Sequence, residues 1–168
     1  MKTRLTVIVL ASMLAACGFH LRGSEFSAEQ LSVDSVYVRS HGNGNILGQE
    51  VINNLKDAGI KIAESPGDAQ YQIVITGVSF ANNVLSVSPQ TGRVEEYQLT
   101  FRATATIRKA GKKKVLNSQT ISVYRDYTAT DRAVLGTFNE VQQLRRDLVR
   151  DAADQVLRIF RATLNKKR

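Results

Sequence analysis

The chain has 168 residues, with 23 lysines and arginines against 15 acidic residues and a formal net charge of +8 at pH 7. This length suits one modest domain, and the positive charge favours anionic partners such as phosphorylated ligands or anionic membranes. The single cysteine excludes an internal disulfide, and the two histidines leave little material for a metal site.

The N-terminus has the layout of a secretory signal. Two cations among the first four residues precede an apolar run, Leu5 to Leu14. Ala15 and Ala16 then lead into Cys17, a pattern that resembles a lipobox, where bacteria acylate the cysteine, for example with palmitate, and cleave before it. The run is too short for a transmembrane span, which needs about 20 apolar residues. A core helix, or an ordinary signal with a chance cysteine, is the alternative.

We therefore predict a signal peptide at 1–16, a lipidated N-terminus and tether at 17–30, and a single domain at 31–168. Loss of the leader would leave 152 residues and lower the net charge by two, to +6. Gly18, rather than an aspartate, follows Cys17, which by resemblance to Gram-negative lipoproteins favours the outer membrane. Export from the cytoplasm argues against nucleic acid as a partner.

The domain begins with a predicted strand over 33–40 and a turn over 41–45. Helical spacing of Leu47, Val51, Leu55 and Ala58 predicts a helix over 46–58, ended by Gly59. A short extended piece follows at 60–62.

Three strands come next. The first spans 71–80, with a continuation towards Val87, and both of its faces are apolar, which predicts a central strand or one covered on both sides. Strict alternation predicts the second over 93–109. After a tight turn at 110–111 the third spans about 112–127, with inward residues Val115, Ile121 and Val123.

A long helix over about 138–164 ends the domain. Its apolar positions with helical spacing are Val141, Leu144, Leu148, Ala152, Val156 and Ile159. The three sequential strands favour an antiparallel meander, and the strand over 33–40 joins it through a β-α-β crossover. We therefore predict an α+β two-layer sandwich. Its two helices would pack on one face of a four-stranded, mostly antiparallel sheet, with hairpin tips projecting beyond the core.

Catalytic patterns are absent from the sequence. Neither His20 nor His41 belongs to a metal-ligand spacing, and no nucleophile elbow or phosphate-binding glycine motif occurs. Glu95 and Glu96 are adjacent in a strand and should point to opposite faces, so they cannot flank one bond. We therefore expect neither an enzyme nor a cofactor or metal.

Basic residues are the candidates for binding. Lys109, Lys112, Lys113 and Lys114, with Arg108, surround one hairpin turn, where ammonium groups suit phosphates. Arg93 lies near the other turn and Arg102 on the polar face of its strand. Arg125 and Arg132 near the end of the sheet are further candidates. A solvated turn and a water-facing sheet are the simpler interpretation of the same residues.

The mature N-terminus resembles a known family. The segment Cys17-Gly18-Phe19-His20-Leu21-Arg22 is similar to the start of LptE lipoproteins, which assemble lipopolysaccharide (LPS), and the segment Glu95 to Leu99 resembles the family's glutamate-tyrosine-glutamine strand entry. Some members carry cations in the turn before that entry and after the fourth strand. Here the nearest cations are Arg93 and Arg132.

This resemblance implies a lipoprotein of the Gram-negative outer membrane that binds one-to-one inside the large LptD β-barrel, assists its assembly and takes part in LPS transport. The domain would lie on the periplasmic side or in the barrel lumen. The LPS-binding candidates are Arg93, Arg102, Lys109, Lys112, Lys113, Lys114 and Arg132. The alternatives are an accessory outer-membrane lipoprotein of another envelope machine, without a lipid ligand, and an envelope hydrolase.

Overall fold

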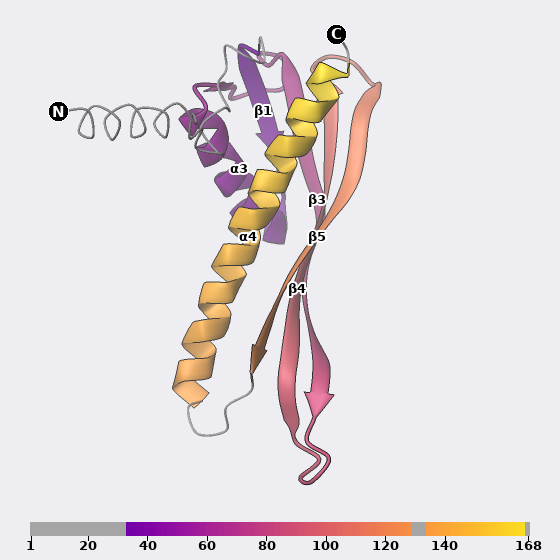
Figure 1. Cartoon of the computed structure of the whole chain (residues 1–168). Coiled ribbons are helices and arrows are strands. Elements are labelled where there is room, and N and C mark those ends of the chain that lie inside the picture. Colours follow the sequence, from indigo (N-terminus) through magenta and orange to yellow (C-terminus); the bar gives the residue numbers. More distant parts are fainter. Residues whose placement is uncertain (1–32, 129–133, 167–168) are drawn as a thin grey trace, which may run out of the picture.

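The structure is a computed structural model that describes residues 33–128 and 134–166 (Figure 1). The predicted signal peptide, the predicted lipidation site Cys17 and the candidate Arg132 lie outside the described residues. The elements in chain order are β1 (Ser35–Arg39), the 3-10 turn η1 (Gly42–Gly44), α3 (Asn45–Asp57), β2 (Lys61–Ile62), β3 (Tyr71–Val87), β4 (Val94–Lys109), β5 (Val115–Thr128) and α4 (Val134–Asn165).

The strands form a five-stranded mixed sheet in the order β2-β1-β3-β4-β5. β1 runs parallel to both β2 and β3, whereas β3, β4 and β5 form the predicted antiparallel meander. The expectation of four strands was therefore wrong by one. The missing strand is β2, which has two residues and is held by the Ala63 N–H donating to the Val36 carbonyl at 2.9 Å. Two residues are too few to show a strand period in sequence.

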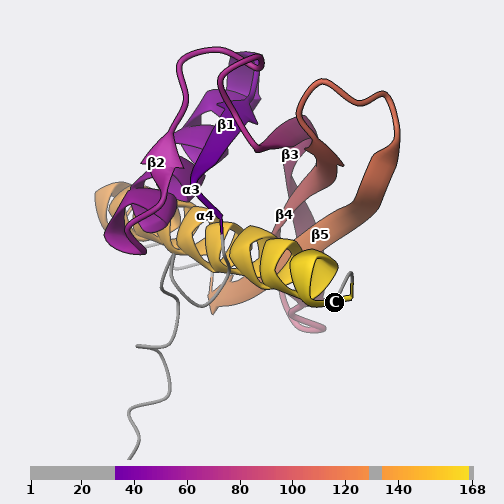
Figure 2. The same ribbon diagram turned by 90° about the horizontal axis from the view of Figure 1, so that it is seen from above.

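Both helices cover one face of the sheet and lie against each other (Figures 1 and 2). The predicted stripe of α3 is buried throughout. In α4 the buried residues are Leu148, Val149, Ala152, Ala153, Val156, Leu157, Phe160, Thr163 and Leu164, a wider face than the predicted stripe. The predicted positions Val141, Leu144 and Ile159 are partly buried at its margin. These two faces and the alternate residues of β4 make one core, so the α+β sandwich is confirmed.

One prediction for β3 was wrong. The alternation of the sequence placed Val78 and Phe80 on the face opposite Ile73 and Ile75. Both instead pack against the core on the helix-covered side, and the Phe80 ring meets Phe101 edge-on with centroids 4.9 Å apart. β3 is central, as expected, but no helix formed by residues 33–128 or 134–166 lies on its second face.

A β-bulge causes this change of face. Thr76 pairs with Thr104 and Ser79 pairs with Arg102. Between these two pairs β3 advances by three residues and β4 by two, so β3 has one extra residue. The extra residue lies next to Gly77, whose φ of +63° favours glycine. After the bulge the side chains of β3 alternate in the opposite phase, which returns Phe80 to the core.

The hairpin between β3 and β4 projects beyond the core at the lower end of the view in Figure 1. β5 begins at Val115, three residues later than predicted, because the lysines at 112–114 remain outside the strand. Lysine is depleted in strands, and neighbouring cations repel each other. Val115 is 44% exposed, so its predicted inward position was wrong, whereas Ile121 is buried and Val123 is partly buried.

Candidate functional site

The predicted basic residues do not gather in one place. Arg93 precedes β4 at the projecting hairpin, and Lys109 ends β4 at the other end of the sheet. A strand rises about 3.3 Å per residue, so these two residues are about 50 Å apart along β4. Arg102 lies between them. The candidates therefore do not form a single binding site. They lie at two basic ends of the sheet, which are joined by the uncovered sheet face.

Four exposed lysines lie at the turn between β4 and β5, namely Lys109, which ends β4, and Lys112 to Lys114. The Lys112 N–H donates to the Lys109 carbonyl at 3.1 Å, and Gly111 has a φ of +68°, which confirms the predicted turn at 110–111. The Ala110 N–H also donates to the Gln70 carbonyl at 3.1 Å. This backbone anchors the turn while leaving the ammonium groups in solvent, where they can meet phosphates as point charges.

The opposite turn fixes the backbone beside Arg93. The Ser88 N–H donates to the Arg93 carbonyl at 2.7 Å, and the Gly92 N–H donates to the Ser88 carbonyl at 2.8 Å. Arg93 itself is exposed at the base of this loop. The loop therefore presents the guanidinium at the tip of the projecting hairpin.

Two stacked tyrosines stiffen the projecting hairpin. The rings of Tyr97 and Tyr127 have centroids 5.4 Å apart, and Asn82 Nδ2 donates to Tyr127 Oη at 2.7 Å. These contacts join all three long strands at the margin of the core, to which Tyr127 belongs and against which Tyr97 packs. The sequence alone does not reveal these contacts, because the pairing of Tyr97 with Tyr127 depends on where β5 begins.

The sheet face opposite the helices is polar. Arg102 is exposed there, and hydroxyl pairs run across β4 and β5, with Thr104 Oγ1 3.2 Å from Thr120 Oγ1 and Thr106 Oγ1 2.9 Å from Ser118 Oγ. Figure 2 shows the helices gathered on the other side. Arg125, a further candidate, forms an ion pair with Asp151 of α4.

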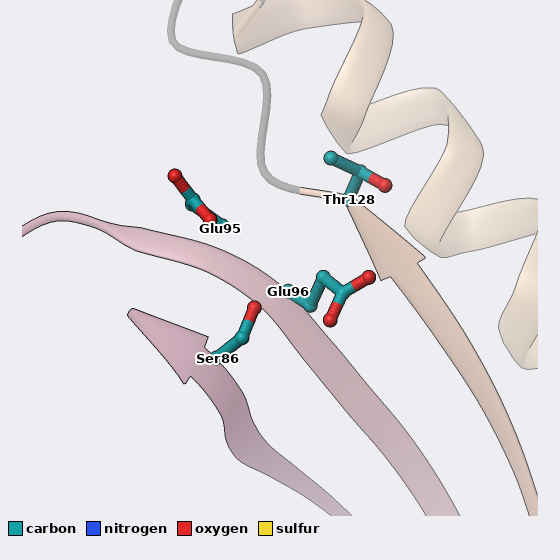
Figure 3. Close-up of a pocket in the computed structure, with 4 residues that line it drawn as sticks. All are labelled: Ser86, Glu95, Glu96 and Thr128. Carbon is teal, nitrogen blue, oxygen red and sulfur yellow. The ribbon is translucent and has the colours of Figure 1, made fainter. Parts of the chain in front are cut away.

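A shallow pocket near the projecting hairpin is lined by Ser86, Glu95, Glu96 and Thr128 (Figure 3). Ser86 and Thr128 pair with Glu96 from either side, so three strands supply the lining. The two carboxylates point in different directions, as strand alternation predicted. The acidic lining of the pocket does not suit a phosphate.

The structure places His41 and the possible metal-ligating side chains of the described residues as follows. Within residues 33–128 and 134–166, no group of three or more His, Cys, Asp or Glu could hold a metal ion. His41 is exposed, and its Nε2 accepts a hydrogen bond from Arg39 Nε at 3.1 Å. His20 lies outside the described residues.

No helix among the described residues has the length and apolar character needed to cross a membrane.

Solved structures with the same fold come from several bacteria. Rare lipoprotein B from Shewanella oneidensis matches with a TM-score of 0.70 and 24% identity, over 80% of this chain and 100% of that one. Lipoprotein B from Nitrosomonas europaea matches with a TM-score of 0.69 and 27% identity, over 84% of this chain and 88% of that one. A minor lipoprotein from Acinetobacter baumannii matches with a TM-score of 0.62 and 21% identity, over 77% and 92% of the two chains.

No curated protein matches the chain. The family model for LptE, described as lipopolysaccharide-assembly, matches residues 32–159, which include all the strands and most of α4. This is a non-enzymatic family, which is consistent with the expectation that the chain is not an enzyme. The chain belongs to the LptE family of lipopolysaccharide-assembly lipoproteins, which act in LPS transport at the outer membrane.

Proposed function

We propose that this lipoprotein binds one-to-one inside the lumen of the LptD β-barrel, assists assembly of that barrel, and takes part in delivering LPS to the outer leaflet. Lipid on Cys17 would hold the chain at the membrane, with residues 17–30 as the tether and 31–168 as the plug domain. The observation that carries the proposal is the family match over residues 32–159.

The uncovered sheet face supports a plug. A helix-free face with exposed Arg102 and paired hydroxyls suits contact with a hydrated wall, and the interiors of outer-membrane barrels are polar. The roughly 50 Å length of the meander allows one end to remain near the periplasm while the other reaches deep into a barrel.

The two basic ends support direct contact with LPS, whose lipid A and core sugars carry phosphates. Lys109, Lys112, Lys113 and Lys114 would bind at one end and Arg93 at the other, with Arg102 between them and Arg132 as a further contact. Ammonium and guanidinium groups at these positions would compete with the divalent cations that bridge LPS molecules in aggregates.

Photo-cross-linking in cells tests this placement. A photoreactive residue at position 102 should cross-link to one very large outer-membrane β-barrel, and residues at 93 and 112 should also cross-link to LPS. Position 53 on the exposed side of α3 is the matched control for non-specific capture. Cross-links from position 102 to a cell-wall synthase, with none to a barrel, would instead favour the accessory-lipoprotein alternative.

A further inference from the structure

The two edges of the sheet differ greatly. β2 ends the sheet at one side with only two residues, whereas β5 ends it at the other side with 14. Among residues 33–128 and 134–166, β4 is the only strand that pairs with β5. In an antiparallel pair, alternate residues direct both backbone groups away from the partner strand. β5 therefore presents a long row of N–H and C=O groups at an open edge.

One hydrogen bond indicates which residues face outward. The Tyr124 carbonyl accepts from the side chain of Arg125 at 3.1 Å, which is expected of a carbonyl that points away from β4. By alternation, Ser118, Thr120 and Ser122 also direct their backbone groups outward. The close hydroxyl contacts of Thr120 and Ser118 with β4 agree, since the pairs without mutual backbone hydrogen bonds lie closer together.

This edge lacks the usual protection against strand pairing. Natural edge strands carry lysine, proline or a bulge that prevents another chain from pairing. From Val115 to Tyr124 β5 contains no charged residue and no proline. The one register shift between β4 and β5 lies at the start of the strand, between Ile107 and Arg108.

α4 does not occupy the edge where it contacts β5. Asn117 Nδ2 donates to Thr163 Oγ1 at 2.9 Å, and Arg125 pairs with Asp151. Both contacts use side chains on the helix-covered face of the sheet, so they leave the in-plane direction beside β5 open.

We propose that β5 binds an extended segment of the partner barrel protein by antiparallel strand addition. This inference rests on the proposed function, because it assigns the β5 edge as a contact with the same partner. The segment would be neutral along Val115 to Tyr124 and would alternate, with polar side chains beside the hydroxyl face and apolar ones beside Ile121 and Val123. Backbone hydrogen bonds would supply the affinity.

Charge favours another protein over a second copy. The chain without its predicted leader has a net charge of +6, so two copies repel each other. Lys112 to Lys114 immediately precede β5, where the C-terminal end of an antiparallel segment would lie. We expect acidic residues at that end of the segment, since they would complement the lysines.

Hydrogen exchange on the purified complex tests the inference at single-residue resolution. The amides of 118, 120 and 122 should exchange at least about tenfold more slowly in the complex than in the isolated chain, whereas those of 119, 121 and 123 should be unchanged. This two-residue period distinguishes strand addition from simple coverage of a face, which would slow neighbouring amides together.

Other outcomes overturn the inference in separate ways. An intact barrel complex in which the amides of 118, 120 and 122 are not protected would contradict strand addition but not the proposed function. If these amides are already protected in the isolated chain, the edge pairs with something other than the barrel. Protection that depends on protein concentration would indicate a second copy, and protection that does not would indicate the N-terminal segment. Failure to obtain any barrel complex removes both proposals.

A matched set of variants provides a second test. Thr120→Pro removes an outward N–H, and proline is tolerated on edge strands, so the fold should persist while recovery of the barrel complex falls about tenfold. Thr120→Ala loses the same hydroxyl but keeps the N–H, so its recovery of the barrel complex should exceed that of Thr120→Pro by about tenfold. Gln119→Pro removes a hydrogen bond to β4 and should lower the melting temperature. Normal barrel binding by folded Thr120→Pro would contradict the proposal.

Discussion

At the scale of single residues, Gly77 has a large structural effect. Its φ of +63° allows the bulge that returns Phe80 to the core. The ring of Phe80 also lies 5.2 Å from the guanidinium carbon of Arg145 on α4. One left-handed residue thus decides which side of β3 packs against the helix.

Gly77→Ala should destabilise the protein by about 1–2 kcal/mol, because an L residue is strained at this φ. The cost comes from the backbone alone, since the nearest atom to an added Cβ is Thr104 Oγ1 at 3.9 Å. Urea unfolding of the purified chain measures it. Gly67→Ala is the control, because its nearest contact is an ordinary 3.7 Å and its φ is not positive. Equal stability of the two variants would contradict this account of the bulge.

The lysine turn yields a second prediction at this scale. Lys112→Gln with Lys113→Gln should weaken binding of purified LPS, by up to about tenfold at low salt, since an exposed charge pair contributes about 0.2–1 kcal/mol. Salt should reduce the difference. Lys56→Gln with Lys61→Gln removes the same charge from the α3 and β2 side. An equal loss in both variants would show that net charge matters and the turn does not.

At the scale of elements, the sequence predicted those helices and strands that show a clear apolar period. The α3 stripe, the alternation of β4 and the order of the main elements followed from apolar spacing. The Gly77 bulge was missed, although an isolated glycine within a strand pattern is a signal for a bulge. The change of face that it causes depends on how β3 pairs with β4, which the sequence does not express. β2 was too short to show a period. The wider buried face of α4 was underestimated because α3 packs beside it as well as the sheet behind it.

Two phenylalanines of α4 test which part of the helix supports the fold. Phe160 is fully buried and meets Tyr71 edge-on at 5.8 Å, so Phe160→Ala should cost about 3–5 kcal/mol. Phe138 is 60% exposed, so Phe138→Ala should change stability by no more than about 0.5 kcal/mol. Chemical denaturation of both variants gives the comparison. A large loss at Phe138 would mean that the first turns of α4 are more firmly packed than the structure shows.

At the scale of the whole molecule, the surfaces that form the core are separate from those that could bind partners. One sheet face and the helices α3 and α4 enclose the core, while the described residues leave the other sheet face, the two basic ends and the β5 edge uncovered. The sequence identified the basic candidates, since cations in turns are visible in one dimension. It could not show that Arg93 and Lys109 lie about 50 Å apart or that β5 is the edge strand of the described sheet, because both depend on strand pairing. The roles of Cys17 and Arg132 stay predictions.

We propose that the chain is the one-to-one plug of a very large β-barrel. The most direct measurement is purification of the tagged lipoprotein from detergent-extracted outer membranes without boiling, followed by mass identification of the proteins that accompany it. We predict one very large β-barrel in equimolar amount. Recovery of the lipoprotein alone, or with cell-wall synthases, would contradict the account and favour an accessory lipoprotein.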